Sequence, residues 1–102
     1  MSRIPAVLLS FMAMAVLSTP ASAGVADGEK LAKRWCAACH VVASDQKSGS
    51  TQAPAFSTVA AKPGFNAAAL ALFLLEPHPK MPDMGLSRGE AADLAAYIAV
   101  QK

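Results

Sequence analysis

The sequence predicts an all-α protein in which three to four short helices are joined by long ordered loops. Apolar residues recur at the three- and four-residue spacing of a helix in three separate segments of the chain. Each of these segments follows a residue that commonly caps a helix N-terminus. No segment shows the alternation of apolar and polar residues that marks a half-buried strand, and no internal repeat is present.

Residues 1–23 have the pattern of a secretory signal peptide. A basic start at Arg3 precedes an apolar run over residues 4–17, and small residues at 21–23 form a cleavage site. An uncleaved membrane anchor is the alternative, but the run is shorter than the roughly 20 residues that a membrane-spanning helix needs. We therefore expect cleavage after Ala23 and a single mature domain over residues 24–102.

Asp27 is expected to cap a first helix that runs over residues 28–39. Leu31 and Trp35, four residues apart, would share one face of this helix. The two cysteines of the chain would lie at its C-terminal end. Residues 41–55 are polar with little periodicity and predict a loop.

A short helical turn is expected over residues 56–61, and Asn66 is a suitable cap for a longer helix over residues 67–75. The prolines on either side of His78 cannot continue that helix, so a second loop follows it. The expected apolar face of the helix over residues 67–75 holds Leu70, Phe73 and Leu74.

Ser87 and Glu90 have the spacing of a capping box and predict a final helix that runs to about Val100. A domain of this size seldom builds a sufficient core alone and commonly needs disulfides, a metal or a large cofactor. The residues on the expected buried side of the final helix are Ala91, Leu94, Ala95 and Ile98, with Tyr97 beside them.

Cys36, Cys39 and His40 form the pattern C-x-x-C-H, which predicts covalent haem attachment. Export favours this interpretation, because a free cysteine pair in an oxidising compartment tends to form a disulfide. A thioredoxin-like dithiol is disfavoured because no βαβ pattern surrounds the pair. Half of a zinc site is disfavoured because the chain has no second cysteine pair.

On these residues the chain resembles the monohaem class I cytochromes c. Three features match in order: a glycine-bearing first helix that ends in C-x-x-C-H, the Met81-Pro82 loop, and a final helix with Leu94 and Tyr97. The resemblance covers nearly all of residues 24–102. It implies the cytochrome c fold, in which short helices wrap around one covalently bound haem c.

The resemblance also implies a role for each residue of the motif. Cys36 and Cys39 would form thioethers with the haem vinyl groups, and His40 would be the proximal iron ligand. The backbone carbonyl of Pro54 would accept a hydrogen bond from the His40 ring, which fixes the tautomer and orientation of a metal-binding histidine. The alternative is that Pro54 only stiffens the loop.

Met81 is the expected sixth ligand, because a Met-Pro pair shortly before the final helix supplies this ligand in the family. A thioether is a soft ligand that favours ferrous iron. Met84 is a less favoured alternative. His78 is another, and a bis-imidazole iron would have a lower potential than a His/Met iron.

The family has a glycine at the crossing of the first and last helices, which Gly28 matches, with Leu94 and Tyr97 as expected partners. The family's aromatic residue one turn before the first cysteine is replaced by Ala32, so we expect a helix contact reorganised around Trp35. The apolar residues expected to line the haem pocket are Phe56, Phe65, Leu70, Phe73, Leu74 and Leu86.

The expected function is one-electron transfer by an exported, periplasmic monomer that catalyses no reaction of its own. Its partners would be redox proteins, membrane-bound ones among them, attracted by lysines such as Lys33 and Lys80. The net charge of +2 on 102 residues does not support nucleic-acid binding. Two alternatives remain: a dedicated haem subunit of a periplasmic dehydrogenase or oxidase, and a ligand-binding or peroxidatic haem protein in which Met81 is labile.

Overall fold

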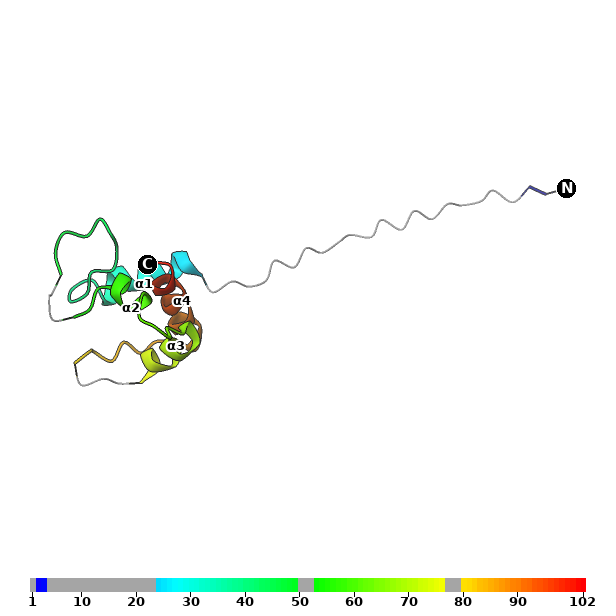
Figure 1. Cartoon of the computed structure of the whole chain (residues 1–102). Helices are drawn as coiled ribbons and strands as arrows, with labels where there is room; N and C mark the ends of the chain where they lie inside the picture. Colours follow the sequence, from blue (N-terminus) through cyan, green and yellow to red (C-terminus); the bar gives the residue numbers. More distant parts are fainter. Residues whose placement is uncertain (1, 4–23, 50–52, 77–79) are drawn as a thin grey trace.

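The computed structural model of the protein describes residues 2–3, 24–49, 53–76 and 80–102 (Figure 1). Across these residues the chain forms four α-helices and no strand, which confirms the all-α prediction. None of these helices is long and apolar enough to cross a membrane. Residues 4–23, most of the predicted signal peptide, lie outside the described residues. The helices are α1 (Val25–Trp35), α2 (Phe56–Ala60), α3 (Ala67–Leu75) and α4 (Arg88–Ala99).

Helix α4 is the centre of the fold, because α1, α2 and α3 all pack against it. Figure 1 shows α1 and α3 on different sides of α4. The predicted buried side of α4 is confirmed. Its buried residues are Ala91, Leu94, Ala95, Tyr97 and Ile98.

Gly28 allows α1 to cross α4 at very short range. A Cβ atom on this residue would overlap the main-chain carbonyl oxygen of Asp93 and would lie 2.8 Å from Cβ of Tyr97. No side chain larger than a hydrogen fits at this contact without moving a backbone. Tyr97 is therefore a crossing partner as expected, and Asp93 is a close partner that was not expected. Leu94 is completely buried in the core cluster that also holds Ala32 and Tyr97.

The start of α1 differs from the prediction, since Gly24 and not Asp27 is its N-cap. The amide of Gly24 donates to Oδ1 of Asp93 at 2.7 Å, which ties the beginning of α1 to α4. The helix consequently starts three residues earlier than the cap pattern indicates. Asp27 lies in the first turn, where its negative charge is favourable near the helix N-terminus.

The end of α1 also differs, because the helix stops at Trp35 and the cysteine motif forms a separate turn. The carbonyl of Ala32 accepts from the amides of both Cys36 and Ala37, at 2.9 and 3.1 Å, so the regular ladder breaks at this point. The amides of Cys39 and His40 then donate to the carbonyl of Cys36. The motif is thus a compact turn and not the last turn of the helix.

The expectation that the helix contact is organised around Trp35 is wrong. Trp35 is 37% exposed, and the guanidinium of Arg34 lies 5.1 Å from the centre of its ring. Ala32 is completely buried instead. Gly28 and Ala32 lie one turn apart on the same face, so small residues allow close backbone packing where an aromatic side chain would keep the helices apart.

The predicted caps of the later helices are present. Oδ1 of Asn66 accepts from the amide of Ala69 at 2.9 Å at the start of α3. At the start of α4, Ser87 and Glu90 exchange both hydrogen bonds of a capping box, each at 3.0 Å. These bonds from Ser87 lower the pKa of the Glu90 carboxyl because they favour its charged form.

Gly28→Ala is expected to lower the free energy of unfolding by about 2 kcal/mol, because the added methyl group forces the two helices apart. The matched control is Gly89→Ala in the first turn of α4, where the nearest atom to the new Cβ would be Oγ of Ser87 at 3.9 Å. The control is expected to leave stability unchanged or to raise it by up to about 1 kcal/mol. Chemical denaturation of the purified proteins measures both, and equal effects would contradict the crossing role of Gly28.

Candidate functional site

A cavity of about 500 Å³ lies between the cysteine turn, the loop before α2, and helices α2, α3 and α4. Its volume falls in the range of sites for small molecules and cofactors, about 300 to 1,000 Å³. Its walls are mainly apolar, as in most such sites. The residues that line it are Cys36, His40, Pro54, Phe56, Val59, Lys62, Ala69, Leu70, Phe73, Leu74, Met81, Leu94 and Ile98.

The cavity brings together most of the residues singled out in the sequence. Phe65 and Leu86 are half-buried and pack against the core rather than lining the cavity. Met84 is half-buried but is not among the lining residues, and His78 lies outside the described residues. The predicted residues that line the cavity are Cys36, His40, Pro54, Phe56, Leu70, Phe73, Leu74 and Met81.

The two cysteines differ in environment, although both carry free thiols. Cys36 is 6% exposed and belongs to the core, and burial raises the pKa of its thiol to about 11. Cys39 is exposed at the other end of the turn. Within the described residues, no group of three or more His, Cys, Asp and Glu side chains is placed to hold a metal ion.

His40 is held by a short hydrogen bond between its Nδ1 atom and the carbonyl oxygen of Pro54, at 2.6 Å. A carbonyl oxygen can only accept, so Nδ1 carries the proton and Nε2 keeps a free lone pair. The ring packs at a tilt against Phe56, with 5.4 Å between centroids. Phe56 in turn contacts Tyr97 of α4 edge to face, at 6.3 Å.

Met81 reaches the cavity from the loop between α3 and α4. This loop turns at Gly85, whose φ of +59° lies in the left-handed region that favours glycine. The amide of Gly85 also donates to Oδ1 of Asp83 at 3.0 Å. The turn brings the chain back to Leu86, which packs against the core, so the loop is anchored on the α4 side of Met81.

The expected apolar face of α3 is only partly buried. Leu70 and Leu74 are half-buried against the core, while Phe73 is 51% exposed although it lines the cavity. No residue of α3 is fully buried. Phe73 therefore lies at the rim of the cavity and not in its depth.

Sequence reasoning missed several residues near the site. Val59 lines the cavity and could have been found from its spacing of three residues to Phe56. Leu94 and Ile98 were expected on the buried side of the final helix but not as lining residues, and both line the cavity. Lys62 also lines the cavity, but a surface lysine after a short helix carries no distinguishing pattern. The hydroxyl of Tyr97 donates to the carbonyl of Val42 at 2.6 Å, a contact between distant segments that no local pattern indicates.

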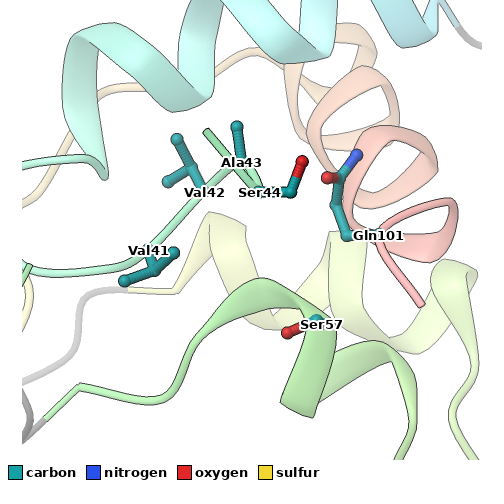
Figure 2. Close-up of a pocket in the computed structure, with 6 residues that line it drawn as sticks. All are labelled: Val41, Val42, Ala43, Ser44, Ser57 and Gln101. Carbon is teal, nitrogen blue, oxygen red and sulfur yellow. The ribbon is translucent and has the colours of Figure 1, made fainter. Parts of the chain in front are cut away.

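A second, much smaller cavity of about 90 Å³ lies behind the segment that follows the motif (Figure 2). Figure 2 shows residues 41–44 passing between α1 and α2, with Gln101 at the end of α4 beside them. Its lining holds no titratable side chain and none of the predicted site residues. The lining residues are Val41, Val42, Ala43, Ser44, Ser57 and Gln101.

The groups that converge on the larger cavity fit a covalently attached haem. Cys36 supplies a thiol, and His40 supplies an imidazole whose Nε2 lone pair is available to a metal. Met81 adds a thioether, which is a soft iron ligand. The remaining walls are apolar, as a hydrophobic macrocycle requires.

Comparisons with known proteins agree with this site. A sequence model of the family described as cytochrome c oxidase, cbb3-type, subunit III matches residues 23–98. The chain is 54% identical over 90 residues to a protein of Bradyrhizobium diazoefficiens named cytochrome c-552. The aligned region covers 85% of this chain and 86% of the relative. No solved structure matches the chain significantly. The chain therefore belongs to the monohaem class I cytochromes c, proteins that transfer electrons on one covalently bound haem c.

Proposed function

We propose that Cys36 and Cys39 form the thioethers to haem c, and that His40 and Met81 are the two axial ligands of its iron. The observation that carries this proposal is the shared cavity, which brings Cys36, His40 and Met81 together from the motif and from the loop before α4. The bond from the His40 ring to Pro54 supports the assignment of His40, because it leaves Nε2 free for the metal.

The haem supplies the exchange of one electron between ferric and ferrous iron. The polypeptide tunes that exchange through its own groups. Pro54 keeps the His40 ring in one orientation and increases its basicity as a ligand. The Met81 thioether favours the ferrous state. The apolar walls exclude water, which raises the potential and limits the rearrangement that follows a change of charge.

We further propose that the protein is a monomeric carrier without an enzymatic activity of its own. If His40 and Met81 both hold the iron, they would leave it no position for a substrate. The family is generally made of electron carriers, and the relative named cytochrome c-552 has nearly the same length as this chain. A ligand-binding or peroxidatic function would require Met81 to leave the iron.

The redox partners are proposed to dock at the rim of the cavity, where Lys62 and Phe73 lie. We now favour Lys62 over Lys33 as the lysine that attracts the partner. Lys33 forms an ion pair with Glu29 at 2.9 Å on α1 and does not line the cavity. Lys80 is exposed in the loop next to Met81 and remains a candidate. Positive charge at this rim would attract acidic partner surfaces and speed the encounter at low salt.

We propose that residues 1–23 are a signal peptide that is removed and that residues 24–102 act in the periplasm. The N-terminal sequence pattern supports this, and so does the family, since c-type cytochromes are typically exported. Helix α1 begins at Val25, directly after the proposed cleavage site.

The mass of the purified intact protein is expected to equal residues 24–102 plus one haem. The double variant Cys36→Ala, Cys39→Ala is expected to lose the haem mass after acid-acetone extraction, because no thioether can then form. Mass spectrometry measures both predictions in one experiment. Haem that stayed covalently bound to the double variant would refute the attachment site, and retention of residues 1–23 would refute cleavage.

Met81→Ala is expected to abolish the red absorption band that sulfur ligation gives ferric haem, and to lower the midpoint potential because the ferrous state loses its soft ligand. Met84→Ala is the matched control and is expected to leave both properties unchanged, since Met84 does not line the cavity. Absorption spectra and a potentiometric titration provide the measurements. Loss of the band and a lower potential in Met84→Ala, with both unchanged in Met81→Ala, would make Met84 the ligand.

Lys62→Glu is expected to slow oxidation of the ferrous protein by hexacyanoferrate about 2- to 10-fold at low salt, because it reverses a charge at the rim. Lys33→Glu makes the same change in net charge on α1, away from the cavity, and is expected to have a smaller effect. Stopped-flow spectroscopy over a range of ionic strength gives the rates. Equal slowing by both variants would show that only net charge matters.

A further inference from the structure

The segment that follows the cysteine motif is neither helix nor strand, yet the carbonyl groups at its start are satisfied. Three successive carbonyl oxygens accept from three donors in different parts of the chain. Nε2 of Gln46 donates to His40 at 2.8 Å, the amide of Phe56 donates to Val41 at 3.0 Å, and the hydroxyl of Tyr97 donates to Val42 at 2.6 Å. The main chain beside the His40 ring is therefore fixed at three consecutive residues.

Gln46 makes more of these bonds than any other side chain described here. Its Oε1 accepts from the amide of Val42 at 2.8 Å. Its Nε2 lies within hydrogen-bond distance of three carbonyl oxygens, those of Ala37 at 3.1 Å, His40 at 2.8 Å and Ser48 at 2.7 Å. Since the amide has two N–H groups, the three acceptors share two donors.

The partners of Gln46 lie on both sides of His40 in the sequence. Ala37 precedes His40 and Val42 follows it, so one side chain connects the residues on both sides of the proposed ligand. A turn, in which the amide of Gln46 donates to the carbonyl of Ala43 at 3.1 Å, brings Gln46 back towards the motif. Figure 2 shows Val41 and Val42 on the segment that follows the motif.

We propose that Gln46 is a positioning residue for His40, a role that rests on the proposed ligation of iron by His40. Pro54 holds the imidazole through Nδ1, and Gln46 holds the backbone from which the imidazole extends. The short Nδ1 hydrogen bond persists only while both ends are fixed. The strength of that bond sets the basicity of the imidazole and thus the preference of the iron for the ferric state.

The test is Gln46→Ala in the haem-loaded protein, measured by NMR hydrogen exchange and by potentiometry. Exchange of the His40 Nδ1 proton and of the Val42 amide proton is expected to become about tenfold faster, as loss of one or two hydrogen bonds predicts. The midpoint potential is expected to rise, because a looser Nδ1 hydrogen bond makes the imidazole a weaker donor to ferric iron.

Two further variants separate positioning from general stability. Ser87→Ala removes the cap of α4, which weakens the fold at a site away from His40, and is expected to leave the potential unchanged. Gln46→Glu keeps an oxygen that can accept from the Val42 amide but removes the Nε2 donor. It is expected to restore protection of the Val42 amide while the exchange of the Nδ1 proton stays as fast as in Gln46→Ala. The exchange rates are the readout for this variant, because its added negative charge lowers the potential by itself.

An unchanged or lower potential in Gln46→Ala, with unchanged exchange of the His40 Nδ1 proton, would overturn the proposal. The same potential shift in Ser87→Ala would also overturn it, because stability alone would then explain the effect. Failure of the proposed ligation is recognised separately. In that case the His40 ring protons of the wild-type ferric protein would lack the large paramagnetic shifts of an iron-bound imidazole, whatever Gln46→Ala does.

Discussion

The close crossing of α1 and α4 at Gly28 is the constraint on which the rest of the structure depends. At this point the backbone of one helix touches the backbone of the other, so neither can slide or rotate without an overlap. The hydrogen bond from Gly24 to Asp93 fixes the start of α1 on the same side of α4. One end of α1 leads into the cysteine turn, while α4 presents Tyr97 and Leu94 to the core. The crossing thus helps to set the distance between the segment proposed to bind iron and the helix that forms one wall of the cavity.

Much of this fold is predictable because its helices carry strong local signals. The capping box at Ser87 and the cap at Asn66 involve residues three apart in the chain, and such signals are visible without knowledge of the fold. The predicted boundaries of α1 are wrong because they depend on contacts that the local sequence does not show. Its start depends on a bond to Asp93, far away in the sequence, and its end depends on the shared carbonyl of Ala32. Trp35 was misplaced because size alone does not show that two helices meet through small residues.

The residues of the candidate site also fall into two groups, those that a local pattern or the family resemblance predicts and those that only the fold reveals. The spacing of Cys36, Cys39 and His40 is a local pattern with a chemical meaning, and the family resemblance pointed to Pro54 and Met81. Gln46 could not be found, because a side chain that bonds to irregular main chain leaves no periodic trace. Phe73 was expected on a buried face, but α3 is apolar on every side, so its spacing cannot indicate which side faces the core.

The small number of large side chains in the core has a consequence for the chain without its haem. Phe56, Tyr97 and Ile98 are buried, but the largest completely buried side chains are Leu94 and Val42, and several of the other core residues are alanines. The polypeptide therefore contributes only part of the apolar volume that a stable domain needs. The haem would supply the rest by filling the cavity. Without the haem, the cavity of about 500 Å³ would stay unfilled, so the thioether bonds would also hold in place a part of the core that the side chains do not supply.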